Sequence, residues 1–320
     1  MFNRNFQRIK TNGIELNAVV EGDGPLVLLL HGFPQCSFLW RHQIDPIIEA
    51  GFRVVVPDQR GYGSSDAPNE VSAYNIRELA NDIAGIAPAL GVDEFIVIGH
   101  DWGAVVAWHT ALLHETSCKA VMGLSVPYMR SEEPPEATNL PDDQFWYIDY
   151  FQEPGVAETE IEGDVRRALL AVYYTISGDS PPGSWIAQCE HPKDSKLLDA
   201  LLMPENLPSW LNEAELDYYV QVFEKSGFRG PLNWYRNLSV LGEVTPELKM
   251  KKVAQPSAFV TGIEDDVLKY PVFQNWMEGM KSFMSDLRFI TRIEGAGHWV
   301  QVERHKETTR EILRFLEMVR

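Results

Sequence analysis

Short apolar runs alternate with longer amphipathic stretches over the first 128 residues of the chain. The apolar runs are rich in β-branched residues, which is typical of buried strands. We expect strands at Ile14–Glu21, Leu26–Leu30, Arg53–Val56, Phe95–Ile98 and Ala120–Val126. Stretches with helical spacing lie between them, at Ser37–Ala50, Ile76–Leu90 and Ala104–His114. This alternation predicts an α/β fold with a mostly parallel sheet and helices on both of its faces.

The pattern changes at about residue 129, and no continuous apolar strand run follows until Ser257–Thr261. Prolines punctuate this middle block, and its remaining segments have helical spacing. We expect helices at Asp164–Tyr174, Asp194–Met203, Asn212–Ser226 and Leu232–Leu241. Residues 129–241 are therefore predicted to form an all-helical insertion, a cap domain.

The α/β pattern returns after residue 242. Ser257–Thr261 and Leu287–Ile293 are expected to be strands, and Pro271–Met284 and Val302–Val319 helices. The prediction is one core domain, residues 1–128 and 242–320, interrupted by the cap. A ligand is expected in the cleft between them, since ligands bind at domain junctions and at the carboxyl ends of parallel strands.

Composition narrows the classes of function. The chain carries 28 Lys and Arg against 46 Asp and Glu, a formal charge of −18, which argues against nucleic acid as a partner. Three cysteines, Cys36, Cys118 and Cys189, lie far apart without metal-ligand spacing, which suits a reducing compartment. We find no apolar leader at the start and no run long enough to span a membrane. A cytoplasmic location is therefore expected.

The strongest chemical motif follows the predicted strand at Phe95–Ile98. The sequence Gly99-His100-Asp101-Trp102-Gly103 has the spacing of a nucleophile elbow, with Asp101 where a serine usually stands. An Asp in this place can also be a simple helix N-cap. As a nucleophile, it would be ionised at neutral pH without a general base and would attack a saturated carbon to form an ester.

A second motif, His31-Gly32-Phe33-Pro34, follows the predicted strand Leu26–Leu30. In isolation it is an ordinary turn at the end of a strand, with Phe33-Pro34 a candidate cis bond. Beside an elbow, it can direct the Phe33 N–H into the cleft. Together with the Trp102 N–H, it would form an oxyanion hole.

The third motif is a histidine on a glycine-rich loop after the last predicted strand, Gly295-Ala296-Gly297-His298. A nucleophile, an acid and then a histidine is the chain order of the α/β-hydrolase fold. The acid should therefore follow Ser257–Thr261. Asp265 is our choice from its spacing to that strand, with Glu264 and Asp266 as open alternatives.

With these motifs in place, the chain resembles the epoxide hydrolases of the α/β-hydrolase fold over essentially its whole length. The core motifs are shared with haloalkane dehalogenases, whereas the cap segments Tyr150-Phe151-Gln152-Glu153-Pro154-Gly155 and Asn233-Trp234-Tyr235-Arg236-Asn237 discriminate. The resemblance implies that Tyr150 and Tyr235 hold the epoxide oxygen. It also implies attack by Asp101, ester hydrolysis by His298 with Asp265, a diol product and no metal or cofactor.

The expected partner is a small lipophilic epoxide. Aromatic residues suggest an apolar pocket, although any of them can belong to the core instead. We expect Phe33, Trp102, Trp234 and Phe38 to contact substrate, and further candidates are Phe145, Trp146, Tyr147, Trp185 and Trp210. The oligomeric state is expected to be a monomer or a homodimer. Two rival functions stay open, a haloalkane or haloacid dehalogenase with the same Asp-His-Asp triad and a non-catalytic ligand receptor.

Overall fold

The computed structural model describes residues 4–128, 141 and 143–320. These residues contain an eight-stranded sheet with the strand order β1-β2-β4-β3-β5-β6-β7-β8. The strands are β1 (Phe6–Thr11), β2 (Ile14–Glu21), β3 (Leu26–Leu30), β4 (Arg53–Pro57), β5 (Phe95–His100), β6 (Cys118–Leu124), β7 (Val253–Gly262) and β8 (Met284–Ile293). The strands from β4 to β8 in this order pair in parallel, and β1 and β2 form an antiparallel edge.

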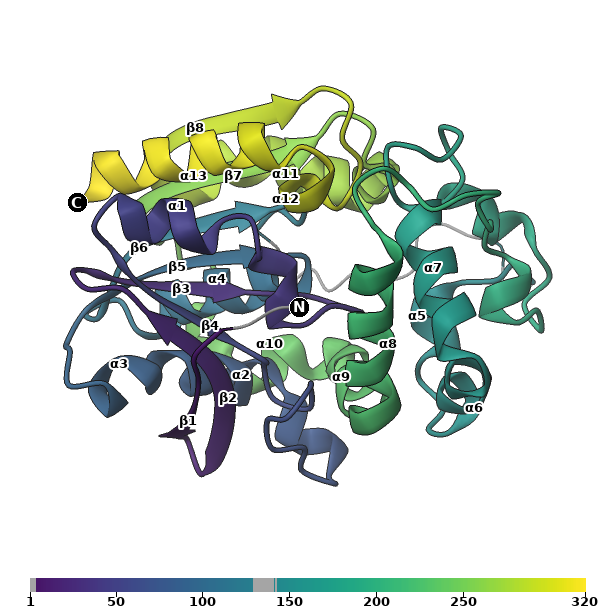
Figure 1. Ribbon diagram of the computed structural model, residues 1–320, viewed down its shortest axis with the longest axis horizontal. Coiled ribbons are helices and arrows are strands. Elements are labelled where there is room, and N and C mark those ends of the chain that lie inside the picture. The colour runs from purple at the N-terminus through teal and green to yellow at the C-terminus, as the bar shows by residue number, and fades with distance from the viewer. Residues whose placement is uncertain (1–3, 129–140, 142) are drawn as a thin grey trace.

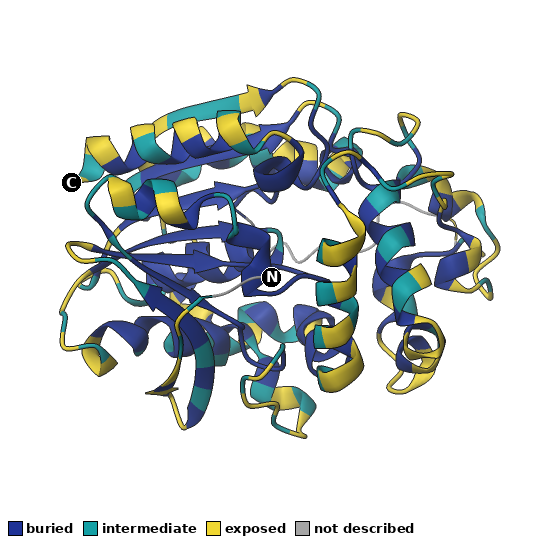
Figure 2. Cartoon of the chain, in the orientation of Figure 1, coloured by how far each residue is buried: buried dark blue, intermediate teal, exposed yellow. Residues whose placement is uncertain are grey.

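Helices cover both faces of this sheet, as predicted (Figure 1). α1 (Ile44–Glu49) and α13 (His305–Val319) pack together, and α2 (Ile76–Ala84) packs on α4 (Trp102–Leu113). α3 (Ile86–Ala89), α11 (Pro271–Phe283) and α12 (Val300–Glu303) complete the core. The central strands are buried along their length (Figure 2), because helices remove water from both sides of a parallel sheet.

Between β6 and β7, the described residues contain helices and short turns and one isolated bridge, Gln144↔Pro192. The helices are α5 (Tyr147–Tyr150), α6 (Val156–Gly163), α7 (Val165–Thr175), α8 (Glu213–Ser226), α9 (Arg229–Tyr235) and α10 (Leu241–Val244). α5 to α8 lie together beyond one end of the strands, at the right of Figure 1. This arrangement supports a helical cap, whose limits at residues 129 and 241 stay a prediction.

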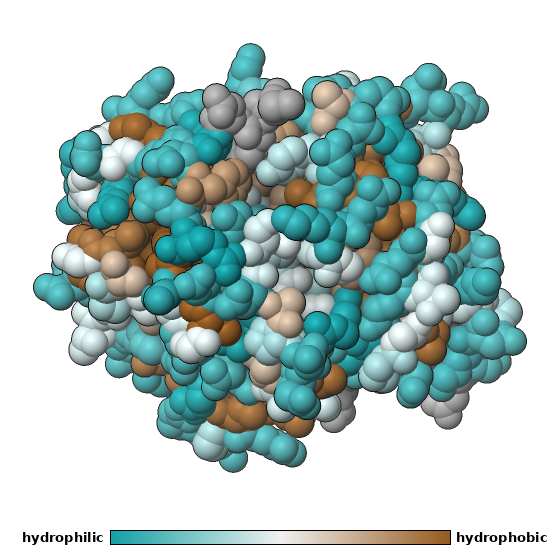
Figure 3. Space-filling view, turned by 60° about the horizontal axis from the view of Figure 1, so that its bottom comes forward, coloured by the Kyte–Doolittle hydropathy of each residue, from teal (hydrophilic) through white to brown (hydrophobic). Residues whose placement is uncertain are grey.

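Two local predictions were wrong. The segment Asp194–Met203 holds only a 3₁₀ turn, Leu197–Asp199, rather than a helix. The edge strand β1 was missed; its two buried residues among charged and polar neighbours give a weak apolar pattern. On the face of the molecule shown in Figure 3, hydrophilic side chains predominate, and hydrophobic side chains gather in small separate groups.

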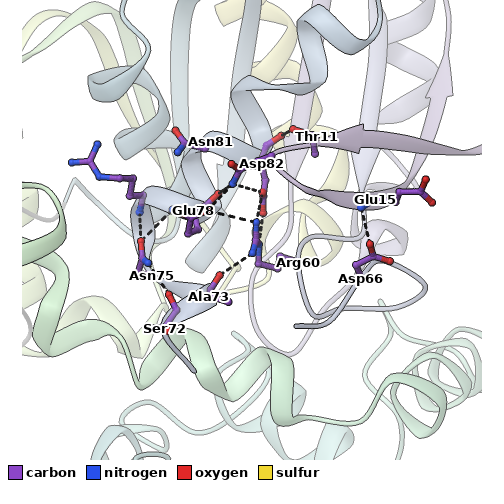
Figure 4. A network of polar contacts seen from close by, with 12 residues as sticks. Thr11, Glu15, Arg60, Asp66, Ser72, Ala73, Asn75, Glu78, Asn81 and Asp82 are labelled. Atoms are coloured by element: carbon purple, nitrogen blue, oxygen red, sulfur yellow. Dashed lines mark hydrogen bonds and ion pairs between the residues drawn. The ribbon is translucent and has the colours of Figure 1, made fainter. Parts of the chain in front are cut away.

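A buried ion pair supports the contact between core and cap. The Arg60 guanidinium donates two hydrogen bonds to the Asp82 carboxylate, at 2.7 and 2.6 Å, and one to the Ala73 carbonyl at 3.0 Å (Figure 4). The Arg60 carbonyl accepts the indole N–H of Trp234 on α9 at 3.1 Å. The forked ion pair therefore holds a stretch of core backbone to which the cap helix α9 is bonded.

Asp82→Asn should lower the free energy of unfolding by about 3–5 kcal/mol, because it leaves the buried Arg60 charge with only the more distant Glu78 carboxylate, at 4.0 Å, as a counter-ion. Chemical denaturation followed by circular dichroism measures this loss. Glu213→Gln is the control, since the Arg166–Glu213 pair is exposed and its loss should cost less than about 1 kcal/mol. Equal losses in the two variants would contradict the stabilising role of the buried pair.

Candidate active site

Asp101 stands at the turn between β5 and α4 in a strained conformation. Its φ is +55° and its ψ is −123°, outside the regions that a non-glycine residue ordinarily occupies. The turn is tight, since a Cβ on Gly99 would lie 1.9 Å from the carbonyl oxygen of Gly103. The strain is the local cost of presenting a carboxylate at the N-terminus of α4, where the helix dipole favours negative charge.

Backbone amides hold the Asp101 carboxylate. The Phe33 N–H donates to its Oδ1 at 2.8 Å, and the Trp102 N–H also donates to the carboxylate. The peptide bond Phe33-Pro34 is cis, as the sequence suggested. A Cβ on Gly32 would lie 2.2 Å from Asp101 Oδ1, so only glycine lets this loop approach. The two amides form the pair that the sequence predicted for an oxyanion hole.

His298 lies between two carboxylates. Its Nε2 is 3.5 Å from Asp101 Oδ2, and its Nδ1 is 3.1 and 3.2 Å from the two oxygens of Asp265. His298 and Asp265 are both buried. The three side chains come from loops that follow β5, β7 and β8 at the same edge of the sheet, so residues distant in sequence meet in one row.

The two alternative acids bind elsewhere. Glu264 accepts the Gly295 N–H at 3.3 Å. Asp266 accepts the N–H groups of Gly183 and Trp185 at 3.1 and 3.0 Å, and it pairs with Lys269 at 2.5 Å. The geometry therefore favours Asp265 as the partner of His298.

Tyrosines of the cap line the opposite wall of the pocket. The Tyr235 ring packs edge-on against Trp102 and Phe33, at centroid distances of 5.1 and 5.4 Å, and its hydroxyl has a side-chain hydrogen bond with Trp102. Tyr147 also lines the pocket, 6.1 Å from Tyr235 between ring centroids. Both tyrosines are buried.

Tyr150, by contrast, does not line the pocket, and its predicted place there is corrected. Its hydroxyl donates to Glu160 Oε2 on α6 at 2.6 Å, neither residue lines the cavity, and the Tyr150 ring is half-buried. The residue that lines the pocket is Tyr147, three positions earlier. A sequence sign was present, because Tyr147 and Phe151 are four residues apart and share one helical face.

The two cap motifs brace each other. The Arg236 guanidinium donates to the Phe151 carbonyl at 3.0 Å and forms an ion pair with Glu158 at 2.8 Å. The Gln152 amide donates to the Ile148 carbonyl at 2.7 Å and to the Tyr235 carbonyl at 3.4 Å. The motifs thus fix α5 against α9, and with them Tyr147 against Tyr235.

The pocket has a volume of about 760 Å³, which includes space open to solvent. Its polar groups are those of Asp101, His298, Tyr147, Tyr235 and the tryptophans, and the rest of the wall is apolar. The apolar lining includes Val105, Val126, Ile148, Phe151, Val172, Ile176, Leu197, Leu238, Val267 and Phe273, with Trp185 and Trp276. The sequence reasoning missed most of these because aliphatic residues in a pocket and in a core have the same pattern.

Of the four residues predicted to contact substrate, Phe33 and Trp102 line the pocket. Phe38 and Trp234 do not, and both predictions are corrected. Phe38 packs on Tyr218 and Tyr219 of α8, at centroid distances of 4.5 and 5.3 Å. Trp234 is fully buried between core and cap, bonded to Arg60. Both aromatics are core residues, which large apolar side chains often are.

The charges in the pocket reinforce each other. Burial lowers the pKa of His298, but Asp265 and Asp101 raise it more, to a value of about 10. Burial raises the pKa of Asp101, but the hydrogen bond and charge of His298, with smaller contributions from His100 and the Trp102 N–H, together outweigh burial and hold that pKa below its ordinary range. Burial, with the nearby Asp101 charge, raises the pKa of both Tyr147 and Tyr235, so these hydroxyls stay protonated at neutral pH.

Within residues 4–128, 141 and 143–320, no group of three or more His, Cys, Asp or Glu side chains is arranged to hold a metal ion. Nor does any helix in that part of the chain have the length and apolar character that crossing a membrane requires.

The fold and site together define an α/β hydrolase with an aspartate at the nucleophile elbow. Residues 25–164 match the family model described as alpha/beta hydrolase fold. The chain is 40% identical to Epoxide hydrolase A of Mycobacterium tuberculosis, an alignment that covers 96% of each protein. It is 35% identical to Epoxide hydrolase B of the same organism, over 96% of this chain and 97% of that one.

Solved structures agree with these relatives. The crystal structure of Epoxide Hydrolase A from Mycobacterium thermoresistibile matches with a TM-score of 0.91 and 38% identity over 99% of each chain. An epoxide hydrolase from an endophytic Streptomyces matches with a TM-score of 0.93 and 34% identity, over 99% of this chain and 96% of that one. The chain belongs to the epoxide hydrolase family of the α/β-hydrolase fold.

The raised pKa of His298 predicts how stability depends on pH. A histidine whose pKa rises on folding stabilises the fold fully below its unfolded value of 6.5, and this contribution is lost as pH rises through about 10. The difference in unfolding free energy between wild type and His298→Gln should therefore shrink from pH 6.5 to pH 10. Urea denaturation of both proteins across that range measures it. A difference that stays constant would contradict the buried ion pair.

Proposed function

We propose that the protein hydrolyses epoxides to vicinal diols through a covalent ester on Asp101. The observation that carries this proposal is that the Asp101 carboxylate of the core and the buried hydroxyls of Tyr147 and Tyr235 from the cap line the same apolar pocket. The similar proteins described above support it, since they are named as epoxide hydrolases.

In the first step, an oxygen of Asp101 attacks one ring carbon of the epoxide. Oδ1 already accepts the Phe33 N–H at 2.8 Å, so Oδ2, which faces His298 at 3.5 Å, is our choice for the attacking atom. The C–O bond to the ring oxygen breaks as the new ester bond forms. The cap then supplies alignment as well as cover, because attack needs the reacting atoms within about 3–3.5 Å.

The ring oxygen leaves as an alkoxide, which needs a proton. Tyr147 and Tyr235 are the proposed donors, with Tyr147 in place of the Tyr150 that the sequence suggested. A phenol is acidic enough to donate to an alkoxide, and the raised pKa of both hydroxyls keeps them in the donating form at pH 7. One tyrosine gives the proton, and the other hydrogen-bonds the same oxygen.

In the second step, His298 removes a proton from water, which attacks the carbonyl carbon of the Asp101 ester. The tetrahedral oxyanion then forms on Oδ1, which accepts the Phe33 N–H, and the Trp102 N–H donates to the same carboxyl group. Asp265 holds the His298 ring through Nδ1 and stabilises the imidazolium. Collapse of this intermediate breaks the bond to the ester oxygen, which takes a proton from the His298 imidazolium and leaves as the diol. The second proton of the attacking water returns to the tyrosinate, so both the Asp101 carboxylate and the tyrosine hydroxyl are restored.

The ion pair between Asp101 and His298 explains how one histidine can serve both steps. Asp101 contributes to the raised pKa of His298. Esterification removes the Asp101 charge, so the pKa of His298 falls once the ester has formed. The imidazole then loses its proton more readily and becomes a general base at the stage at which the reaction needs one.

The apolar wall favours an uncharged, lipophilic epoxide as substrate. The proposed steps use only side chains and water, so neither a metal nor an organic cofactor takes part. We also propose a cytoplasmic location, which the free and buried state of Cys36, Cys118 and Cys189 supports.

The rival function, a haloalkane dehalogenase, needs N–H donors for a leaving halide. Trp102, the residue after Asp101, lines the pocket, and its side chain is hydrogen-bonded to the hydroxyl of Tyr235. That contact favours a tyrosine-bound oxygen over a halide at this point in the pocket. A non-catalytic receptor is disfavoured because Asp101, His298 and Asp265 are in contact.

Purified wild type should convert styrene oxide to its diol and release no bromide from a bromoalkane. His298→Gln should form the ester but hydrolyse it slowly, by about 10²–10⁴-fold, because the general base is missing. Intact-protein mass spectrometry should then show a gain equal to one whole epoxide.

Asp101→Ala is the control, and it should show neither adduct nor diol. Bromide release without diol would move the assignment to a dehalogenase. Turnover of styrene oxide by wild type with no adduct on His298→Gln would overturn the two-step scheme.

Tyr147→Phe should slow alkylation of Asp101 by about 10-fold or more, because it removes one of the two hydroxyls that bind the ring oxygen. Tyr150→Phe is the matched control, three residues away in the same short helix, and should alkylate at a rate close to wild type. Single-turnover mixing with rapid acid quench measures both rates. If alkylation were slow in Tyr150→Phe and close to wild type in Tyr147→Phe, the role of binding the ring oxygen would return to Tyr150.

A further inference from the structure

Glu303, at the end of α12, is a buried carboxylate that does not line the pocket. Its Oε2 accepts the N–H groups of Gly297 and Gly178, each at 2.8 Å, and its Oε1 accepts the Trp299 N–H at 2.8 Å. Three backbone donors thus converge on one side chain. Burial raises the pKa of this carboxyl to about 7, although the three amides act in the opposite direction.

Two of these donors flank the catalytic histidine. Gly297 precedes His298 and Trp299 follows it, so Glu303 holds the loop on either side of the imidazole. The third donor, Gly178, belongs to the cap just after α7. One side chain therefore connects the loop that carries the general base with the domain that covers the substrate.

The loop and the cap are also in direct contact. The backbone N–H of His298 donates to the Ile176 carbonyl at 3.0 Å. A Cβ on Gly297 would lie 2.3 Å from the Gly178 nitrogen, so the two backbones approach as closely as glycines permit. Ile176 itself lines the pocket, so the cap segment that binds this loop also contacts the substrate cavity.

The remaining backbone atom of His298 is held by the core. Its carbonyl accepts from His100 Nε2 at 2.8 Å and from Ser125 Oγ at 2.7 Å. With its own N–H bound to the cap, the position of the imidazole along the loop depends on the peptide units on either side. Glu303 binds the unit after His298 through the Trp299 N–H, and it binds the unit one residue further back through the Gly297 N–H.

Asp101 is held by different groups, the Phe33 and Trp102 amides at the head of α4. A change at Glu303 should therefore displace His298 while leaving the nucleophile and its tyrosines in place. In a two-step reaction, such a displacement slows hydrolysis of the ester more than its formation.

We propose that Glu303 is a positioning residue for the hydrolytic step, which holds His298 in line with the Asp101 ester and ties its loop to the cap. This inference rests on the proposed two-step function. Glutamine at this position has one acceptor oxygen, so its NH₂ group must face at least one of the three backbone N–H donors.

The test compares Glu303→Gln with wild type in single-turnover and steady-state rapid-quench experiments on styrene oxide. Alkylation should stay within about 3-fold of wild type, whereas ester hydrolysis should fall by about 10-fold or more, in the range expected when a reacting group is displaced by a fraction of an ångström. The esterified fraction of enzyme at steady state should rise accordingly, measured by intact-protein mass spectrometry.

Glu311→Gln is the matched control. Glu311 is also a buried glutamate, but it accepts from Arg314 and Thr291 at 3.0 and 3.1 Å, away from the catalytic loop. Its loss should lower the stability of the fold but leave the ratio of the two rates unchanged. Glu303→Asp, which keeps the charge but is one methylene shorter, provides a second variant with the same expected direction if Glu303→Gln does not fold.

The outcomes separate the two proposals. Slow hydrolysis with near-normal alkylation in a Glu303 variant, but not in Glu311→Gln, supports the inference. Equal slowing of both steps, or the same ratio of rates in both variants, would overturn it while the two-step function stands. Diol formation by wild type without any ester intermediate would overturn the function itself.

Discussion

The Asp101 carboxylate has to stay ionised although the fold removes it largely from water, and the groups around it make this possible. A carboxylate removed from water is costly unless hydrogen bonds and opposite charge replace its hydration. Here the Phe33 and Trp102 amides, the start of α4 and His298 supply them. The positive φ at Asp101 and the close contact at Gly99 follow from the same requirement, because they bring a strand end, a helix start and a loop to one point.

The cap answers a different need. In the proposed mechanism, its tyrosines must remain protonated beside a negative charge and must face a substrate that water would otherwise surround. Burial and the Asp101 charge raise the pKa of both Tyr147 and Tyr235, so one arrangement keeps the proposed acid protonated beside the ionised carboxylate proposed as nucleophile. The cap thereby contributes chemistry and a dry environment together, and the braces at Gln152 and Arg236 keep its two helices in register.

The core could be predicted from the sequence because its signals are local. The strand Phe95–His100, the glycines of the elbow and the histidine after the last strand each lie in a short window, and the topology brings them together. Tyr150 and Tyr147 differ only in their position on one helical turn, which packing against Tyr235 decides and a motif does not. The prediction that Phe38 and Trp234 contact substrate was wrong for a related reason, since an aromatic side chain has the same chemistry in a pocket wall and in a packed interface.

The bonds between the cap and the catalytic loops bear on how such enzymes diversify. Glu303 binds the backbone at Gly178, and Asp266, the neighbour of the triad acid, binds it at Gly183 and Trp185. A cap transplanted from a relative would arrive without the partners that these carboxylates hold, and a productive chimera would have to exchange the two loops along with it. Under the proposed mechanism, substrate range in this architecture is therefore inherited together with the loops that carry the groups for ester hydrolysis.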